Sequence, residues 1–164
     1  MTAPQRAGLQ PGLRATNGVK NVINVQVASR AKGIPGKTML RRWARAALVS
    51  GKPASLTLRV VPLGEARALN SAYRGKDYAT NVLTFEYGAD PGGGLHGDIV
   101  LCAAVVAAEA KRQGKSLTSH YAHLTVHGVL HMQGYDHEGT ADARKMESLE
   151  IKLLAKLGYA DPYR

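Results

Sequence analysis

The alternation of hydrophobic and polar residues divides the chain into strands and helices from residue 22 onward. Alternating or continuous apolar runs predict four strands, over residues 22–27, 56–61, 81–86 and 98–101. Apolar residues spaced three and four apart predict five helices, over residues 38–49, 64–73, 103–113, 117–133 and 141–157. The last strand is almost entirely apolar, which is typical of a central strand. This order of elements predicts an α+β fold, in which about five helices pack on a small four-stranded mixed sheet.

The ends of the last three helices are marked by individual residues. Gly114, Gly134 and Gly158 each follow a predicted helix, and glycine adopts the left-handed conformation that closes a helix at the least cost. Ser116 and Thr140 precede the last two helices and are candidate N-caps. These residues predict three separate helices after the fourth strand.

Residues 1–21 show no such periodicity. They are rich in glycine, proline and polar residues, a composition typical of mobile chain ends. We therefore expect a mobile N-terminal arm over residues 1–21. Residues 22–164 are expected to form a single domain, because one hydrophobic core is usual at this length.

The composition narrows the class of protein. Of the 164 residues, 45% are hydrophobic, which suffices for a packed core and is too many for a disordered chain. The single cysteine, Cys102, excludes an intramolecular disulfide and fits a reducing compartment. No apolar run approaches the roughly 18 residues of a membrane-spanning helix. We expect a soluble, cytoplasmic protein that has no membrane partner.

The net charge of +10 is distributed unevenly along the chain. Residues 1–64 contain eleven basic residues and no acidic one, whereas residues 65–164 are close to neutral. This asymmetry favours a polyanionic partner, nucleic acid before an anionic membrane surface. Three arginines, Arg41, Arg42 and Arg45, are predicted on the outer side of helix 38–49. The alternative is that these basic residues only keep the surface solvated.

One segment of this basic part resembles a nucleotide-binding motif. Residues 31–38 read AKGIPGKT, close to the phosphate-binding pattern GxxxxGK[ST]. Ala31 replaces the first glycine, and no acidic residue that could hold Mg²⁺ occurs before Glu65. We interpret the segment as a helix start capped by Thr38.

The strongest chemical signal is a group of three histidines. His127 and His131 are four residues apart, so they lie on one helical face with Cβ atoms about 5–6 Å apart. Gly134 ends the helix and allows the chain to return His137 to the same place. Two imidazoles on a helix and a third beyond it can bind one Zn²⁺ and leave a fourth position open for water. Asp136 is a candidate hydrogen-bond acceptor beside the site.

Other residues of the same segment limit this interpretation. His123 continues the histidine face, but about 12 Å of helix rise separates it from His131, so the two cannot share an ion. His120 and His123 are therefore expected to support the ligands, face RNA or be structural. The HxxxHxxGxxH spacing also occurs in metzincin proteases, where a glutamate follows the first histidine as general base. Gly128 occupies that position here, which disfavours a peptidase.

Several blocks of the sequence resemble the bacterial YbeY endoribonucleases, also called rRNA maturation factors. The blocks are YRGKD at 73–77, TNVLTF at 80–85, GDI at 97–99, HYAH at 120–123, the segment His127–His137 and LGY at 157–159. His96 departs from the family pattern, where a leucine commonly precedes the Gly-Asp pair, and residues 1–21 lie outside the matched region.

The resemblance implies the function and the site. It implies that residues 22–164 form a single metal-binding endoribonuclease domain with one Zn²⁺ on His127, His131 and His137. It also implies cleavage of single-stranded RNA, maturation of the 3′ end of small-subunit rRNA from its precursor, association with the small ribosomal subunit and a part in ribosome quality control. Arg74 matches the functionally important arginine of the family, and a guanidinium there can bind phosphate oxygens. The alternative for Arg74 is a structural pair with Asp77 or an interaction with its own helix end.

Two other functions stay open at this point. One is a ribosome-assembly RNA-binding factor with a structural metal and little or no catalysis. The other is a metal-dependent peptide hydrolase, which Gly128 makes the weakest of the three.

Overall fold

The structure is a computed structural model that describes residues 20–164. Within that range the chain forms four strands and five helices, ordered as follows: β1 (Asn21–Val27), α3 (Lys37–Ala46), β2 (Ala54–Val61), α4 (Leu63–Arg74), β3 (Val82–Ala89), β4 (Leu95–Cys102), α5 (Ala103–Gln113), α6 (Leu117–Met132) and α7 (Thr140–Lys156). The predicted α+β class is confirmed. The predicted mobile arm lies outside the described residues except for its last two, and Asn21 already pairs with Ala54 in the sheet.

The sheet has the strand order β1-β2-β4-β3 and is mixed, as predicted. β1, β2 and β4 are parallel, and β3 is an antiparallel edge strand beside β4. The nearly continuous apolar strand, β4, lies inside the sheet, as predicted. Its start was missed, because the strand begins at Leu95 and not at Asp98.

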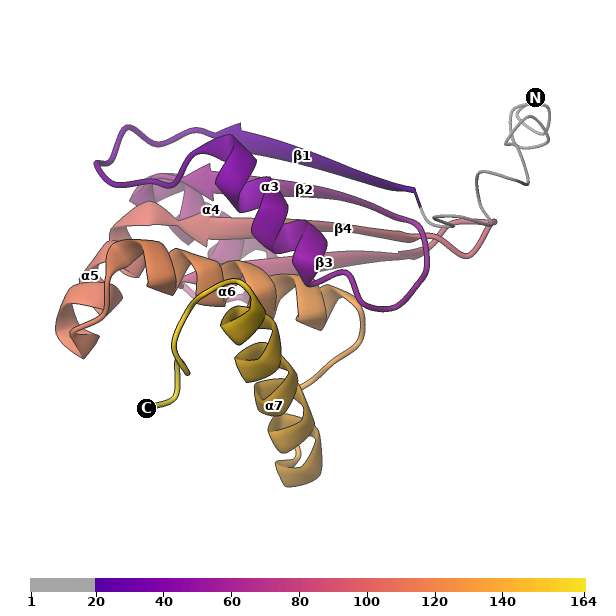
Figure 1. Ribbon diagram of the computed structural model, residues 1–164. Helices are drawn as coiled ribbons and strands as arrows, with labels where there is room; N and C mark the ends of the chain where they lie inside the picture. The colour runs from indigo at the N-terminus through magenta and orange to yellow at the C-terminus, as the bar shows by residue number, and fades with distance from the viewer. Residues whose placement is uncertain (1–19) are drawn as a thin grey trace.

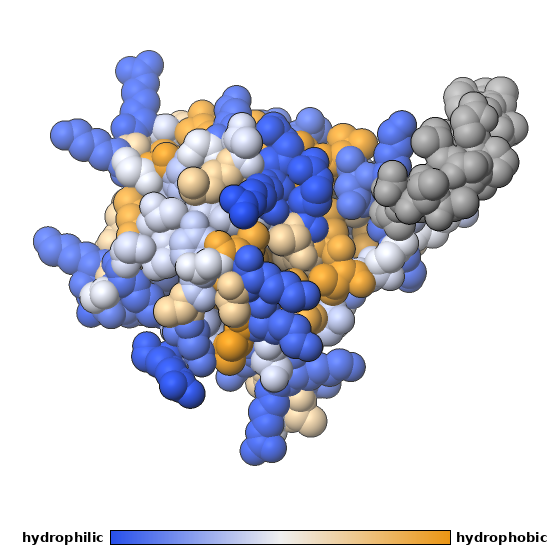
Figure 2. Space-filling view, in the orientation of Figure 1, coloured by the Kyte–Doolittle hydropathy of each residue, from blue (hydrophilic) through white to orange (hydrophobic). Residues whose placement is uncertain are grey.

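Two layers of helices cover the two faces of the sheet (Figure 1). Leu56, Leu58 and Val60 of β2 alternate toward the larger core, which α3, α6 and α7 close. Val61, Leu83 and Val100 belong to the smaller core, which α4 closes. On the face shown in Figure 2, hydrophilic side chains project at many points of the outline, with hydrophobic residues between them.

The predicted helix boundaries hold in part. Ser116 caps α6 through a hydrogen bond from the Ser119 N–H to its Oγ (3.1 Å), as predicted. The prediction for Thr140 was wrong, because Gly139 is the N-cap of α7 and Thr140 is its first residue. Gly36 is likewise the N-cap of α3, so Thr38 lies inside that helix rather than capping it.

The exposed arginine face of α3 is smaller than predicted. Arg42 and Arg45 are exposed, but Arg41 is half-buried and its Nε donates to the Ile23 carbonyl at 3.1 Å. Arg41 therefore attaches α3 to the edge strand β1. Only two of the three arginines remain fully available to a polyanion.

Candidate metal centre

Helix α6 carries the candidate site and is itself almost entirely buried. Ten of its sixteen residues are buried, because α3, α5, α7 and the sheet surround it. Its half-buried side includes His123, His127 and His131. Successive rings along this side are close: the His120 and His123 ring centres are 6.2 Å apart, as are those of His123 and His127. The predicted helical spacing thus places a row of imidazoles on one side of a rigid helix.

The segment after α6 turns back and brings His137 to this row. Gly134 has φ +100°, a left-handed conformation that lets the chain reverse after the helix. Asp136 Oδ1 accepts hydrogen bonds from the backbone N–H groups of His137 (2.6 Å) and Glu138 (3.3 Å). The His137 ring centre lies 5.6 Å from that of His127 and 6.1 Å from that of His131. The carboxylate of Asp136 therefore shapes the turn that presents His137.

Hydrogen bonds fix the orientation of the two helical imidazoles. His127 Nδ1 lies 2.6 Å from Glu150 Oε2, and His131 Nδ1 lies 3.0 Å from the Tyr135 carbonyl oxygen. Both partners are acceptors, so each Nδ1 carries the proton and each Nε2 keeps a lone pair. Metal-binding histidines are commonly held in this way by a carboxylate or a carbonyl.

The ring separations from His137 are wider than those expected around one tetrahedral ion. Zn–N bonds of about 2.0–2.1 Å place the centres of two ligating rings about 5 Å apart. The separations of 5.6 and 6.1 Å from His137 to the other two rings are slightly wider than this. Three imidazoles, two of them oriented by acceptors, form a donor set of a type that suits zinc.

The described residues contain two groups of ligand atoms within 4.8 Å of one another, and the three predicted ligands are divided between them. His131, Asp136 and His137 form one group, and His123, His127 and Glu150 form the other. Both groups consist of imidazole and carboxylate side chains, which are residue types that can bind a metal ion. In the second group, however, His127 Nδ1 and Glu150 Oε2 are 2.6 Å apart, closer than the about 3.3 Å between two ligand atoms on one tetrahedral zinc. That distance is a hydrogen bond, so Glu150 supports His127 from behind.

Glu150 is the functional residue that the sequence reasoning missed. Its side chain is completely buried on α7. Burial raises the pKa of the Glu150 carboxyl, but hydrogen bonds from His123, His127 and Tyr163 outweigh this and lower the pKa to about 2. The carboxylate is therefore ionised at neutral pH. The sequence held a signal: Met146, Glu150 and Leu154 share the buried face of α7, so an acidic residue stands in an apolar stripe.

His123 and His120 have different partners. His123 Nε2 lies 2.9 Å from Glu150 Oε1, so it supports the same carboxylate as His127. His120 Nε2 lies 2.8 Å from Glu109 Oε1 on α5, and Glu109 also accepts from Asn81 at the start of β3 (3.0 Å). Of the roles predicted for these two histidines, His123 supports a candidate ligand and His120 is structural.

Arg74 is the last residue of α4 and is exposed. The alternative pairing with Asp77 does not occur, because Arg67 binds both oxygens of Asp77 at 2.8 and 3.0 Å. Within residues 20–164 the Arg74 guanidinium makes no hydrogen bond or ion pair. It lies on a different element from the histidines, next to the exposed aromatic side chain of Tyr73.

None of the helices described in residues 20–164 is long and apolar enough to cross a membrane.

The fold and the histidine cluster together define a class: an α+β protein with side chains placed to hold a metal ion. Residues 25–158 match the family described as Endoribonuclease YbeY. The chain belongs to this family of endoribonucleases, enzymes that cleave phosphodiester bonds within RNA.

Individual relatives agree with the family match. The chain is 53% identical over 141 residues to the endoribonuclease YbeY of Nitrosomonas eutropha, which covers 86% of this chain and 97% of the relative. It is 56% identical over 141 residues to the endoribonuclease YbeY of Methylobacillus flagellatus, which covers 86% and 92%. A solution structure of a Thermotoga maritima protein aligns with a TM-score of 0.51 at 20% identity, over 87% of this chain and 99% of that one. That last similarity supports the fold alone.

Proposed function

We propose that this protein is a zinc-dependent endoribonuclease that cleaves single-stranded RNA, with one Zn²⁺ held by His127, His131 and His137. The observation that carries the proposal is the pair of hydrogen bonds from His127 Nδ1 to Glu150 and from His131 Nδ1 to the Tyr135 carbonyl. These bonds use Nδ1 and leave Nε2 of each ring as the candidate ligand atom, and the two ring centres lie 5.6 and 6.1 Å from that of His137. Family membership supports the reaction, and the two hydrogen bonds support the choice of His127 and His131 as ligands.

The proposed substrate is precursor rRNA of the small ribosomal subunit. We assign the protein to cytoplasmic maturation of the 3′ end of that rRNA and to ribosome quality control. The family match and the net charge of +10 support an RNA partner, because basic residues bind the phosphate backbone. Single-stranded segments suit a surface with exposed aromatic side chains, on which unpaired bases stack, and Tyr73 and Tyr78 on either side of Arg74 are 69% and 55% exposed.

The chemistry divides between the metal and the chain. A bound Zn²⁺ polarises phosphoryl oxygens and lowers the pKa of its water to about 7. The imidazoles of His127, His131 and His137 would hold this ion. Arg74 is proposed to donate to nonbridging phosphate oxygens, since a planar guanidinium can contact two of them at once. Its freedom from the Asp77 carboxylate supports this role.

The test of the metal site compares wild-type protein with His131→Ala. We expect the variant to lose bound metal and cleavage of precursor rRNA while its circular dichroism spectrum is unchanged. His96→Ala is the matched control, because His96 pairs with Asp90 at the turn between β3 and β4. Cleavage by metal-free wild-type protein at the rate of the loaded protein would overturn the metal-dependent mechanism.

The same assays distinguish the endoribonuclease from the alternative function, a ribosome-assembly RNA-binding factor. A wild-type protein that binds metal and pre-ribosomal particles but cleaves no RNA would be an assembly factor with a structural metal.

The role of Arg74 is tested by Arg74→Lys, which keeps the positive charge and loses the bidentate contact of the guanidinium. Arg112→Ala is its control, because Arg112 also lies in the last turn of a helix that a left-handed glycine closes. We expect Arg74→Lys to slow cleavage with metal content unchanged, and Arg112→Ala to change neither.

A further inference from the structure

The chain beyond α7 reaches back to the row of histidines. We propose that this C-terminal segment, residues 159–164, is part of the metal centre, with Tyr163 as a positioning residue that holds Glu150 and, through it, His127. The inference rests on the proposed function in one respect, that His127 is a metal ligand.

Glu150 is the residue that joins the tail to the site. Its Oε2 faces His127 Nδ1 at 2.6 Å, and its Oε1 faces His123 Nε2 at 2.9 Å. The Tyr163 hydroxyl donates to the same Oε1. Because Glu150 is completely buried, the loss of a donor leaves one of its lone pairs without that partner. Tyr163 therefore supplies one of the three donors that fix this carboxylate.

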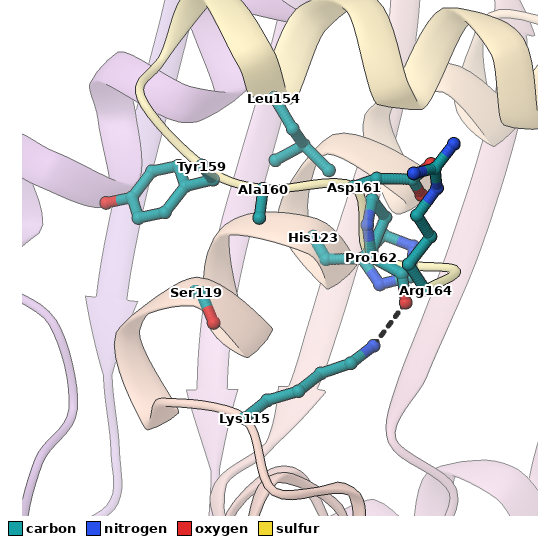
Figure 3. Close-up of a pocket in the computed structure, with 9 residues that line it drawn as sticks. All are labelled: Lys115, Ser119, His123, Leu154, Tyr159, Ala160, Asp161, Pro162 and Arg164. Carbon is teal, nitrogen blue, oxygen red and sulfur yellow. Dashed lines mark hydrogen bonds and ion pairs between the residues drawn. The ribbon is translucent and has the colours of Figure 1, made fainter.

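The tail is attached so that the tyrosine hydroxyl points inward. The Tyr159 ring packs edge-on against buried Trp43, with ring centres 5.8 Å apart. The Lys115 ammonium donates to the Pro162 carbonyl (Figure 3). Asp161 Oδ1 accepts from the Tyr163 N–H at 2.8 Å and forms the turn that directs the side chain. The Tyr163 ring stays 46% exposed although its hydroxyl reaches a buried carboxylate.

Beyond the packing of Tyr159 on the larger core, the tail borders a cavity. A cavity of about 220 Å³ lies between the tail and helices α6 and α7, and it is lined by residues 159–162 and Arg164 of the tail and by Lys115, Ser119, His123 and Leu154. Figure 3 shows these side chains and those of the tail around the same space. A segment that spans a cavity depends on its specific polar attachments. The hydroxyl of Tyr163 is such an attachment, and the carboxylate that it reaches faces the candidate metal ligand.

The consequence for His127 follows from its hydrogen bond. Nε2 has a lone pair for a metal only while Nδ1 keeps its proton, and Glu150 Oε2 accepts that proton's hydrogen bond. A carboxylate held by fewer donors can rotate, and the imidazole is then held less firmly. Partners behind metal-binding histidines typically affect metal affinity about 10–100-fold when they are changed. Tyr163 contacts Glu150 and not His127 itself, so we expect the loss of its hydroxyl to lower Zn²⁺ affinity by a smaller factor, about 3–10-fold.

The experiment compares Tyr163→Phe with Tyr159→Phe in the full-length protein. Each variant removes one tyrosine hydroxyl from the tail and keeps the ring, but only the Tyr163 hydroxyl contacts Glu150. Zn²⁺ affinity is measured by competition with a chelator. The ¹⁵N shifts of the His127 imidazole are recorded on metal-free protein. We expect weaker Zn²⁺ binding and a changed His127 signal for Tyr163→Phe, with both unchanged for Tyr159→Phe.

The outcomes separate this inference from the proposed function. Unchanged Zn²⁺ affinity and an unchanged His127 signal in Tyr163→Phe would overturn the role of the tail, whatever the protein does to RNA. A wild-type protein that binds zinc tightly but does not cleave RNA would overturn the proposed function and leave the role of the tail intact. If wild-type protein bound no zinc, the zinc site would be wrong, and an unchanged His127 signal would then overturn the tail contact as well.

Discussion

Two of the three histidine–glutamate contacts of helix α6 are similar in length but differ in which partner is buried. His120 contacts Glu109 of α5 at 2.8 Å, and His127 contacts Glu150 of α7 at 2.6 Å. In the first pair the imidazole is 4% exposed and the carboxylate 19%. In the second pair the imidazole is 24% exposed and the carboxylate is fully buried. In the first contact the histidine is the buried partner. In the second contact the glutamate is the buried partner, and the histidine stays partly exposed.

This difference indicates what each pair does. The imidazole of His120 is enclosed, and Glu109 also accepts from Asn81, so the pair connects α6, α5 and the start of β3. The imidazole of His127 is partly exposed, and its ring centre lies 5.6 Å from that of His137. The same two residue types therefore serve packing in one place and support a candidate metal ligand in the other.

The most direct way to break this comparison is Glu150→Gln. Glutamine has one acceptor oxygen where the carboxylate accepts from His127, His123 and Tyr163. If its amide N–H₂ faces His127, the ring must accept at Nδ1 and protonate Nε2, which removes the ligating lone pair. We expect Zn²⁺ affinity to fall about 10–100-fold, measured by chelator competition. Affinity equal to that of the wild type would mean that Glu150 does not orient His127.

Glu109→Gln is the matched change in the other pair. It weakens the contacts to His120 and Asn81, and one net hydrogen bond contributes about 0.5–1.5 kcal/mol. We expect the free energy of unfolding to fall by about 1–2 kcal/mol, measured by urea denaturation of metal-free protein. Zn²⁺ affinity should stay as in the wild type. A Glu109→Gln protein that loses zinc as strongly as Glu150→Gln would remove the distinction between the pairs.

The sequence predicts the fold best where a single periodicity governs the segment. Leu56, Leu58 and Val60 alternate, and all three are buried in the sheet. The start of β4 was missed because Gly97 has no side chain to show a pattern. A Cβ at Gly97 would lie 2.6 Å from the Met132 sulfur and 2.8 Å from the Phe85 carbonyl oxygen, so α6 packs directly on the backbone there. That requirement comes from a helix distant in sequence.

The candidate site likewise contains residues that local spacing predicts and residues that only tertiary contacts bring to it. The spacing of His127, His131 and His137 is local, and the structure brings their rings together around His137, although their ligation of zinc stays a prediction. Glu150 and Tyr163 belong to the site only through tertiary contacts, with Glu150 23 residues from His127. No local pattern indicates that a tyrosine beside the last residue of this sequence reaches a buried carboxylate.

The smallest effect that we predict is a pH dependence of folding stability that comes from His120, the enclosed histidine of the His120–Glu109 pair. Burial lowers the pKa of His120, and the neighbouring charges of His123 and Lys115 act in the same direction, while Glu109 raises it. The pKa of a free histidine is about 6.5. Just below this pH, His120 binds a proton in the unfolded chain but not in the folded protein. Folding stability from this residue is therefore complete above about pH 6.5 and is lost as the pH falls toward the lower pKa of the folded state.

The measurement is the free energy of unfolding of metal-free protein between pH 7 and pH 5, for wild type and for His120→Gln. One histidine contributes a slope of at most about 1.4 kcal/mol per pH unit, so we expect the wild type to lose up to about 1 kcal/mol more than the variant over this range. Metal-free protein is used because proton binding at metal ligands would otherwise add its own pH dependence. Parallel curves for the two proteins would show that His120 is no more protected from protonation when folded than when unfolded. The contrast between an enclosed and an outward-facing histidine would then rest on metal affinity alone.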